Sequence, residues 1–130
     1  MQKALKVMIT ESDNEAIDDI QKAFDTYLPC CVLEITNYGR QCVNAVQDDG
    51  CPDVIILGLD LADISGFDVI EEVRKCSEVP VIAVSYIKDA PVVAQSLNMG
   101  ADGYVFKPIR QREFIARTKA ILRRREIETG

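Results

Sequence analysis

Five short apolar runs alternate along the chain with longer segments whose apolar residues recur at helical spacing. The runs cover residues 5–10, 31–36, 54–59, 79–85 and 104–106, and the helical segments cover residues 14–28, 40–47, 66–73, 90–99 and 110–127. Strands that alternate with helices predict parallel pairing, because a chain needs a crossover to re-enter a sheet in the same direction. The pattern therefore predicts an α/β fold with an open, doubly wound sheet of five parallel strands.

The length and composition suit a single domain. With 130 residues, 48% of them hydrophobic, the chain can bury its own core, and we place the domain at residues 1–130 with the last helix at about 110–127. No run of 18 apolar residues occurs, and the first ten residues contain no basic segment followed by an apolar one. Neither a membrane span nor a signal peptide is indicated, and we expect a cytoplasmic protein.

The charge is acidic overall and unevenly distributed. The net charge of −6 argues against nucleic-acid binding by the domain as a whole. From Arg110 to Arg125, however, seven basic residues face one acid, Glu113. Such a basic segment is either a solvated face or a docking surface for an acidic partner.

Composition also limits the chemistry. Histidine is absent, so the commonest general base is missing. The cysteines form no Cys-x-x-Cys pair and do not indicate a zinc site. We expect them to be reduced residues that fill the core; they are Cys30, Cys31, Cys42, Cys51 and Cys76.

Sheets of this kind place function where the carboxyl ends of the strands meet, near the point where the strand order reverses. We therefore expect the functional site among the residues that follow the strands. These are Glu11-Ser12-Asp13, Gly58-Leu59-Asp60, Ser85-Tyr86 and Lys107-Pro108.

Four motifs stand in the order and at the spacing of a known family. They are Pro52-Asp53 before an apolar strand, Gly66 eight residues after Gly58, Pro80-Val-Ile-Ala-Val-Ser85, and Gly100-Ala-Asp-Gly-Tyr-Val-Phe-Lys-Pro108. With these motifs the chain resembles the receiver domain of two-component response regulators, the CheY-like family, over essentially its whole length. The resemblance implies a flavodoxin-like (βα)5 fold with strand order 2-1-3-4-5.

The resemblance also implies roles for the strand-end residues. In the family, a strand-end aspartate takes a phosphoryl group from a phosphohistidine, two acids hold Mg²⁺, and a hydroxyl and a lysine bind the phosphoryl oxygens. By position, Ser85 is the hydroxyl, Lys107 is the lysine, and Tyr104 is the aromatic residue that reports the switch. Gly58 stands at the aspartate position. A glycine has no side chain to phosphorylate, so we expect no phosphoryl transfer there.

The acid positions depart from the family pattern as well. Glu11 and Ser12 fall on them, with Asp13 just beyond, so a serine stands where a carboxylate would bind Mg²⁺. A strongly hydrated cation needs carboxylates in place of the water it gives up. We therefore expect no enzyme activity and no cofactor beyond weak Mg²⁺ binding. Combining Gly58→Asp with Ser12→Asp is expected to recover some Mg²⁺ binding.

Asp60 is the alternative phosphoryl acceptor. It lies two residues after Gly58 and would keep the same side-chain parity along a strand. It would also shorten the interval to Gly66 from eight residues to six. Its carboxylate would then lie roughly 6 to 7 Å farther out, beyond Ser85 and Lys107. The competing interpretation is an exposed loop acid.

Lys107 lacks the aspartate that it contacts in the family. Either Glu11 or Asp13 takes it as an ion pair that holds the site in one state, or its side chain extends into water. The sequence does not decide between these two arrangements of the Lys107 side chain. The resemblance further implies a cis peptide bond between Lys107 and Pro108, and without a phosphoryl group the Tyr104 ring is expected to be set by packing alone.

Two interpretations of function remain. The favoured one is a phosphorylation-independent pseudo-receiver that works by protein contact in a two-component-type regulator, because Gly58 and Ser12 are two independent losses at one site. Its last helix resembles that of receivers in winged-helix transcription factors, which favours a place in such a protein. The alternative is a phosphorylatable receiver that uses Asp60 with Mg²⁺. A nucleotide- or flavin-binding domain is disfavoured, because no Gly-x-Gly-x-x-Gly motif or phosphate-binding glycine loop occurs.

The resemblance places the contact surface on the fourth helix, the fifth strand and the fifth helix. Asp102, Glu113 and Arg117 match the charge pattern of that face, while Gln95 and Gly103 stand where a basic and an acidic residue are expected. We expect a homodimer or another protein partner there, with Arg117 of one chain near Asp102 of the other. A relative of the histidine kinases is a further candidate partner. Neither nucleic acid nor a membrane is expected to bind this domain directly.

Overall fold

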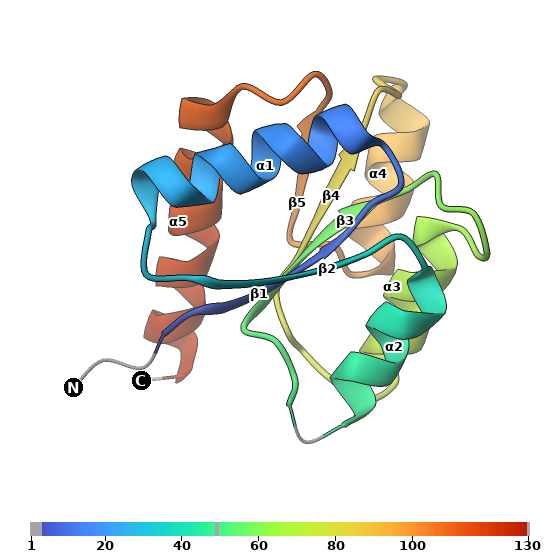
Figure 1. Ribbon diagram of the computed structural model, residues 1–130. Helices are drawn as coiled ribbons and strands as arrows, with labels where there is room; N and C mark the ends of the chain where they lie inside the picture. Colours follow the sequence, from blue (N-terminus) through green and yellow to red (C-terminus); the bar gives the residue numbers. More distant parts are fainter. Residues whose placement is uncertain (1–3, 49, 130) are drawn as a thin grey trace.

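The computed structural model describes residues 4–48 and 50–129, and in this part of the chain five strands alternate with five helices (Figure 1). In chain order the elements are β1 (Lys6–Thr10), α1 (Asn14–Tyr27), β2 (Val32–Thr36), α2 (Gly39–Gln47), β3 (Val54–Gly58), α3 (Gly66–Arg74), β4 (Val81–Ser85), α4 (Ala90–Met99), β5 (Gly103–Phe106) and α5 (Gln111–Thr129). All neighbouring strands pair in parallel, in the order β2-β1-β3-β4-β5. The predicted α/β fold and strand order are confirmed.

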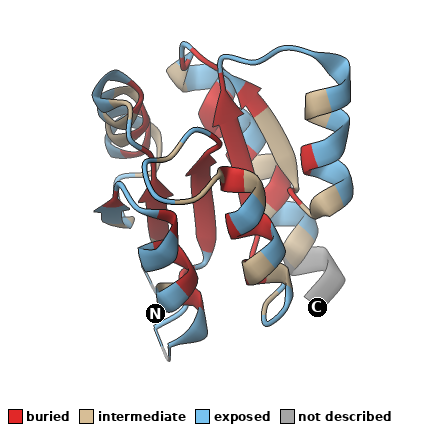
Figure 2. Ribbon diagram, turned by 90° about the vertical axis from the view of Figure 1, so that its right-hand side faces the viewer, coloured by how far each residue is buried: buried red, intermediate tan, exposed pale blue. Residues whose placement is uncertain are grey.

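Helices cover the sheet on both faces. On one face Phe24 of α1 packs edge-to-face against Phe114 of α5, with ring centroids 5.8 Å apart. On the other face α2 and α3 contribute Val43 and Val69 to a second core. Figure 1 shows α1 and α5 on one side of the sheet and the other three helices on the opposite side. Every residue of β3 and β4 is buried, as Figure 2 shows in red, which explains their almost unbroken apolar sequence.

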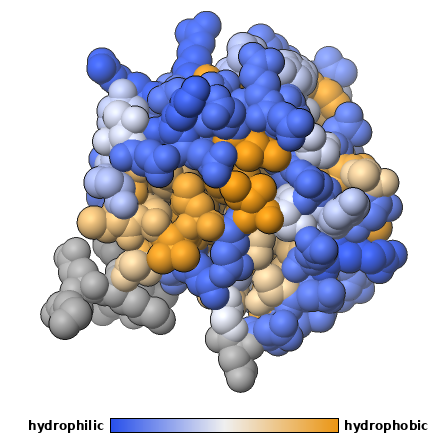
Figure 3. All heavy atoms as spheres, viewed as in Figure 1, coloured by the Kyte–Doolittle hydropathy of each residue, from blue (hydrophilic) through white to orange (hydrophobic). Residues whose placement is uncertain are grey.

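The edge strand β2 is less covered than the strands inside the sheet. Val32 and Ile35 are 51% and 43% exposed, and Figure 3 shows an apolar patch over this strand. Because β2 has a neighbour on one side only, its side chains meet fewer covering residues than those of β3.

Side chains from the loops cap the starts of two helices. Asp13 Oδ1 accepts hydrogen bonds from the backbone N–H groups of Glu15 (3.1 Å) and Ala16 (3.4 Å) and thereby caps α1. The start of α2 is capped from a distant loop, because the Asp63 carboxylate accepts from the N–H groups of Gly39 (2.8 Å) and Arg40 (3.0 Å). Desolvation alone would raise the pKa of Asp63, but these backbone donors lower it below its usual value.

One cysteine of five is a core residue. Cys42 lies buried on α2, where desolvation raises the pKa of its thiol to about 11. Of the others, Cys31 is half-buried and packs against the core on the α1 side of the sheet. Cys30, Cys51 and Cys76 are exposed, so the expectation that all of them fill the core is wrong for these three, which lie in turns and loops between the elements. All five thiols are free.

The guanidinium of Arg74 joins three segments at the end of α3. It donates to the carbonyl of Gly100 (2.8 Å) after α4 and to that of Val79 (2.8 Å) before β4. The same group pairs with Asp102 at 3.1 Å, and Asp102 in turn accepts from the N–H of Val81 (2.8 Å). One side chain thus supplies donors to backbone acceptors that no helix or strand satisfies.

Arg74→Ala is therefore expected to lower the free energy of unfolding by about 2–3 kcal/mol, because the partly buried carbonyls of Gly100 and Val79 lose their side-chain donor and Asp102 loses one of its partners. Urea denaturation followed by circular dichroism measures this. Lys75→Ala is the control, since Lys75 pairs with Glu72 on the surface, and its expected effect is below about 1 kcal/mol. Equal effects of the two variants would contradict the role given to Arg74.

Candidate functional site

The strand-end residues meet at one edge of the sheet, as the topology requires. Glu11 follows β1, Gly58 ends β3, Ser85 ends β4 and Lys107 follows β5. The sheet register pairs Thr10 with Leu57, which places Glu11 directly beside Gly58. The backbone N–H of Lys107 donates to the Ser85 carbonyl at 2.8 Å and so holds the ends of β4 and β5 together.

Glu11 and Lys107 form a buried ion pair at the centre of this edge. Glu11 Oε2 lies 2.8 Å from Lys107 Nζ, and the two side chains are 1% and 6% exposed. Lys107 Nζ also lies 3.5 Å from Asp13 Oδ2. Of the two fates expected for Lys107, the ion pair is present and the extension into water is wrong.

The remaining oxygens of the two carboxylates are also engaged. Glu11 Oε1 accepts from the backbone N–H groups of Ser12 (3.0 Å) and Asp13 (3.2 Å). Asp13 uses Oδ1 to cap α1 and Oδ2 to face Lys107. Desolvation alone would raise the pKa of Asp13, but the N–H of Ala16 and the charge of Lys107 lower it. Both acids are therefore held in place by the protein itself.

The space beside Gly58 is filled by Glu11. A Cβ atom added at Gly58 would lie 2.6 Å from the carboxyl carbon of Glu11, closer than real contacts allow. A longer side chain at this position would have to displace a carboxylate that is anchored by Lys107 and by two backbone N–H groups. Glycine at position 58 and glutamate at position 11 are thus sterically complementary. The sequence alone indicated only a loss at Gly58 and did not reveal that Glu11 fills the space of the missing side chain.

Ser12 connects the two loops of the site. Its hydroxyl donates to the backbone carbonyl of Asp60 at 2.9 Å, which joins the end of β1 to the loop after β3. The Asp60 side chain itself is exposed and makes no ion pair with another described residue. Among the described residues no cluster of three acidic or cysteine side chains is arranged to hold a metal ion.

Ser85 and Tyr86 complete the edge. The buried hydroxyl of Ser85 accepts from the backbone N–H of Ile87 at 3.1 Å. The Tyr86 ring lies over Lys107, with Nζ 5.4 Å from the ring centroid. Desolvation and the nearby Asp13 carboxylate raise the pKa of Tyr86. Tyr86 therefore helps to cover the ion pair. The sequence did not reveal this role, because it shows only a tyrosine that follows a strand.

Tyr104 is half-buried beside the site. Its hydroxyl donates to the Ile87 carbonyl at 2.8 Å, and its ring packs edge-to-face against Phe106 at 5.6 Å. The ring orientation is therefore set by a hydrogen bond as well as by packing, which differs from the expectation. The Lys107-Pro108 peptide bond is cis.

The charged residues expected at the contact surface are engaged within the chain. Asp102 pairs with Arg74 (3.1 Å) and with Arg125 (3.0 Å), and Arg117 pairs with Glu113 one turn away on α5 (3.2 Å). An Arg117–Asp102 contact between two chains would compete with these pairs. None of the described helices combines the length and apolar character needed to cross a membrane.

Comparison with known proteins gives matches over most of the chain. A family model described as the response regulator receiver domain matches residues 7–119. The transcriptional regulatory protein KdpE of Mycobacterium tuberculosis is 47% identical over 100 residues, which cover 71% of this chain and 44% of that protein. The DNA-binding response regulator MtrA of Mycolicibacterium smegmatis is 39% identical over 90 residues, which cover 69% of this chain and 39% of that protein.

Solved structures agree on the fold. The CheY-like receiver domain protein from Methanospirillum hungatei superposes with a TM-score of 0.86 at 20% identity, over 97% of this chain and 99% of that chain. At this identity the likeness concerns the fold alone. The chain spans less than half the length of the two regulators that it matches in sequence.

Proposed function

Because the chain belongs to the response regulator receiver family, we propose that it is a pseudo-receiver, a domain that signals by binding a protein partner without accepting a phosphoryl group. In a receiver the strand-end aspartate and a strand-end lysine act together on the phosphoryl group. Here Gly58 stands at the aspartate position, and Lys107 is already neutralised by Glu11 at 2.8 Å. That ion pair is the observation that supports the proposal most directly.

The residues at the acid positions do not fit a Mg²⁺ site. Mg²⁺ requires near-octahedral oxygen ligands and dehydrates reluctantly. Glu11 spends both oxygens on Lys107 and on backbone N–H groups, and Asp13 spends its own on α1 and Lys107. Ser12 occupies the Asp60 carbonyl with its hydroxyl. A bound cation would have to displace these donors, including a buried ammonium group.

The expected result is that the intact mass of the protein stays unchanged after incubation with acetyl phosphate and Mg²⁺. A receiver that carries an aspartate at the end of β3 is the positive control. The second candidate function, a receiver phosphorylated on Asp60, is favoured by the exposure of that residue. A phospho-adduct that is lost in Asp60→Asn would establish this alternative and overturn the pseudo-receiver proposal.

The signalling role then rests on a surface. We place it on α4, β5 and α5, the face that carries Tyr104, Glu113 and Arg117. The two relatives are a transcriptional regulatory protein and a DNA-binding response regulator, each more than twice as long as its match. We therefore propose that this domain regulates a transcription factor or a similar output, and that DNA contact belongs to another domain.

A further inference from the structure

The outer side of β2 is an open edge of the sheet. The backbone N–H of Val32 donates to the Leu5 carbonyl at 2.8 Å, so Val32 faces β1. Successive residues of a strand direct their backbone groups to opposite sides, and Leu33 and Ile35 therefore direct theirs away from β1. No described strand lies against that side of β2. The N–H and C=O groups of Leu33 and Ile35 are thus available to a further strand.

The sequence of β2 lacks the features that usually keep an edge strand from pairing with another chain. Edge strands are commonly protected by lysine, by proline or by a bulge. The strand Val-Leu-Glu-Ile-Thr contains neither lysine nor proline, and its register with β1 runs without a bulge from Val32 to Thr36. Val32 and Ile35 are exposed apolar residues. An open and apolar edge of this kind is suited to the addition of a strand.

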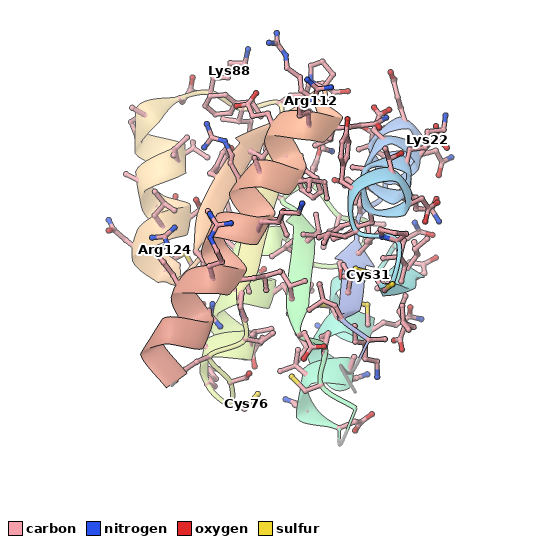
Figure 4. All side chains as sticks on the ribbon, turned by 90° about the vertical axis from the view of Figure 1, so that its left-hand side faces the viewer. Lys22, Cys31, Cys76, Lys88, Arg112 and Arg124 are labelled. Carbon is pink, nitrogen blue, oxygen red and sulfur yellow. The ribbon has the colours of Figure 1, made fainter. Side chains whose placement is uncertain are left out.

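This edge is remote from the α4–β5–α5 face. Strands β2 and β5 form the two opposite edges of the sheet. Figure 4 shows Cys31, which precedes β2, on the side of the molecule away from Lys88, which precedes α4, and from Arg124 of α5. A molecule bound along β2 would leave the α4–β5–α5 face free.

The two faces of the sheet differ in chemistry beside β2. On the α1 side, Leu33 packs against the core and Ile35 lies in register with the core residue Ile9. On the other side, a shallow hollow of about 310 Å³ lies between β2 and α2, and Glu34 and Asp48 are part of its lining. Those two are the only charged residues that line the hollow. A strand added to β2 would therefore meet apolar side chains on one face and carboxylates on the other.

The carboxylate of Glu34 has room for a further cation. Its Oε1 lies 3.5 Å from Lys6 Nζ, and both side chains remain partly exposed. The same ammonium group donates to the Gly50 carbonyl at 2.8 Å. Glu34 and Asp48 thus border the hollow with one nearby ammonium group, which is shared with a backbone carbonyl. The charge of this part of the edge favours a basic occupant.

A second copy of the chain fits the edge less well. Two copies related by a two-fold axis would pair their β2 strands antiparallel. The arrangement that uses the whole of both strands matches Val32 with Thr36 and places Glu34 opposite Glu34 of the second copy. Like charges directly opposite each other destabilise a strand pair.

From these observations we infer that the β2 edge binds an extended segment of a different protein in which apolar and basic residues alternate. Side chains opposite Leu33 and Ile35 are apolar, and the side chain opposite Glu34 is lysine or arginine and lies over the hollow. Main-chain hydrogen bonds to β2 supply affinity, and the alternation supplies specificity. The inference goes beyond the proposed function, because it adds a second docking surface on the opposite edge of the sheet.

The test uses a short fluorescent peptide in which lysine and valine alternate, and a matched peptide with glutamate in place of lysine. Fluorescence anisotropy at low salt should show saturable binding of the lysine peptide alone, and added salt should weaken it. Glu34→Lys is expected to weaken binding by about tenfold or more, since an attractive contact becomes repulsive. Glu71→Lys makes the same change in charge at an exposed position on α3, and its expected effect is below about threefold.

Equal loss in Glu34→Lys and Glu71→Lys, no binding of the lysine peptide, or equal binding of the glutamate peptide would overturn the inference. Two further peptides carry N-methyl groups on their valines or on their lysines. Only one edge of an added strand faces β2, so one of these peptides should lose binding by about tenfold or more while the other retains it. Equal binding by both would show that charge alone holds the peptide, which contradicts strand addition.

Ile35→Pro makes the corresponding test on the protein. It removes an N–H that faces away from β1, at an edge position where proline is tolerated. Binding of the lysine peptide should weaken by about tenfold or more, whereas Ile35→Ala, which keeps the N–H, should weaken it by about threefold at most. Similar losses in the two variants would argue against a hydrogen bond from this N–H and overturn the inference.

Hydrogen exchange of the wild-type chain gives a readout that does not depend on the folding of a variant. The bound lysine peptide should slow exchange at the N–H groups of Leu33 and Ile35 and leave those of β5, the other edge strand, unchanged. Unchanged exchange at β2, or equal slowing at both edges, would rule out an added strand on β2.

Sedimentation across a concentration series addresses the second copy. The wild-type chain and Ile35→Pro should show the same state of association. A wild-type dimer that Ile35→Pro abolishes would overturn the inference in favour of self-association through β2. None of these readouts involves phosphoryl transfer, so they leave the pseudo-receiver proposal to the mass measurement.

Discussion

Glu11→Ala is expected to lower the free energy of unfolding by about 3–5 kcal/mol, because it leaves the ammonium group of Lys107 buried without its closest anion. Lys107 is 6% exposed, and its other anion, Asp13, is farther away at 3.5 Å. The variant also removes the acceptor for the backbone N–H groups of Ser12 and Asp13. Urea denaturation with circular dichroism gives the free energy directly.

Removing both charges should be far less damaging than removing one. In Glu11→Ala with Lys107→Met, no unpaired charge stays buried, so much of the stability is expected to return. Glu113→Ala is the matched control for an ion pair on the surface, because Glu113 and Arg117 are more than half exposed; its expected effect is below about 1 kcal/mol. A cost for Glu11→Ala as small as for this control would refute the structural role of the ion pair.

The arrangement of the elements could be predicted from the sequence because both faces of the sheet are buried. Buried central strands need nearly continuous apolar runs, and the helices between them need one apolar stripe. The ends of the elements were harder to predict. Strand β4 begins at Val81 and not at residue 79, because Pro80 has no N–H group to donate to the sheet. The cysteine prediction failed because burial depends on whether a loop residue meets a covering element, which no local pattern records.

The location of the site was also predictable, since parallel strands bring their carboxyl ends to one edge. The contacts across that edge were not, because they depend on the direction of long side chains. Asp63 reaches the start of α2, and Ser12 reaches the Asp60 carbonyl, over separations of 24 and 48 residues. One signal was available: β1 and β3 are neighbours in the predicted strand order, so a long acid after β1 stands beside a glycine that ends β3.

Gly58→Asp is the second variant with a large expected effect, a destabilisation of about 2–4 kcal/mol without metal. The new Cβ atom would enter the space of the Glu11 carboxyl carbon, at 2.6 Å, and would force Glu11 away from Lys107. A second carboxylate would also add a like charge beside Glu11 and Asp13. Gly58→Ala supplies the steric effect without the charge and should be destabilising too, by a smaller amount. Thermal or urea unfolding of both variants at low salt separates the steric effect from the charge effect.

The combination of Gly58→Asp with Glu11→Ala distinguishes replacement from simple loss. If Glu11 occupies the place of a side chain at position 58, the new aspartate gains both room and Lys107 as a partner, so the double variant should be about 1–3 kcal/mol more stable than additivity predicts. Gly58→Ala with Glu11→Ala should recover the steric part alone. Additive effects of Gly58→Asp and Glu11→Ala would contradict the complementarity of the two positions.

The same reasoning revises the expectation for Mg²⁺ binding. In Gly58→Asp with Ser12→Asp, Glu11 still pairs with Lys107 and still occupies the space beside position 58. Mg²⁺ binding should therefore return only when Glu11 is replaced by a smaller residue as well.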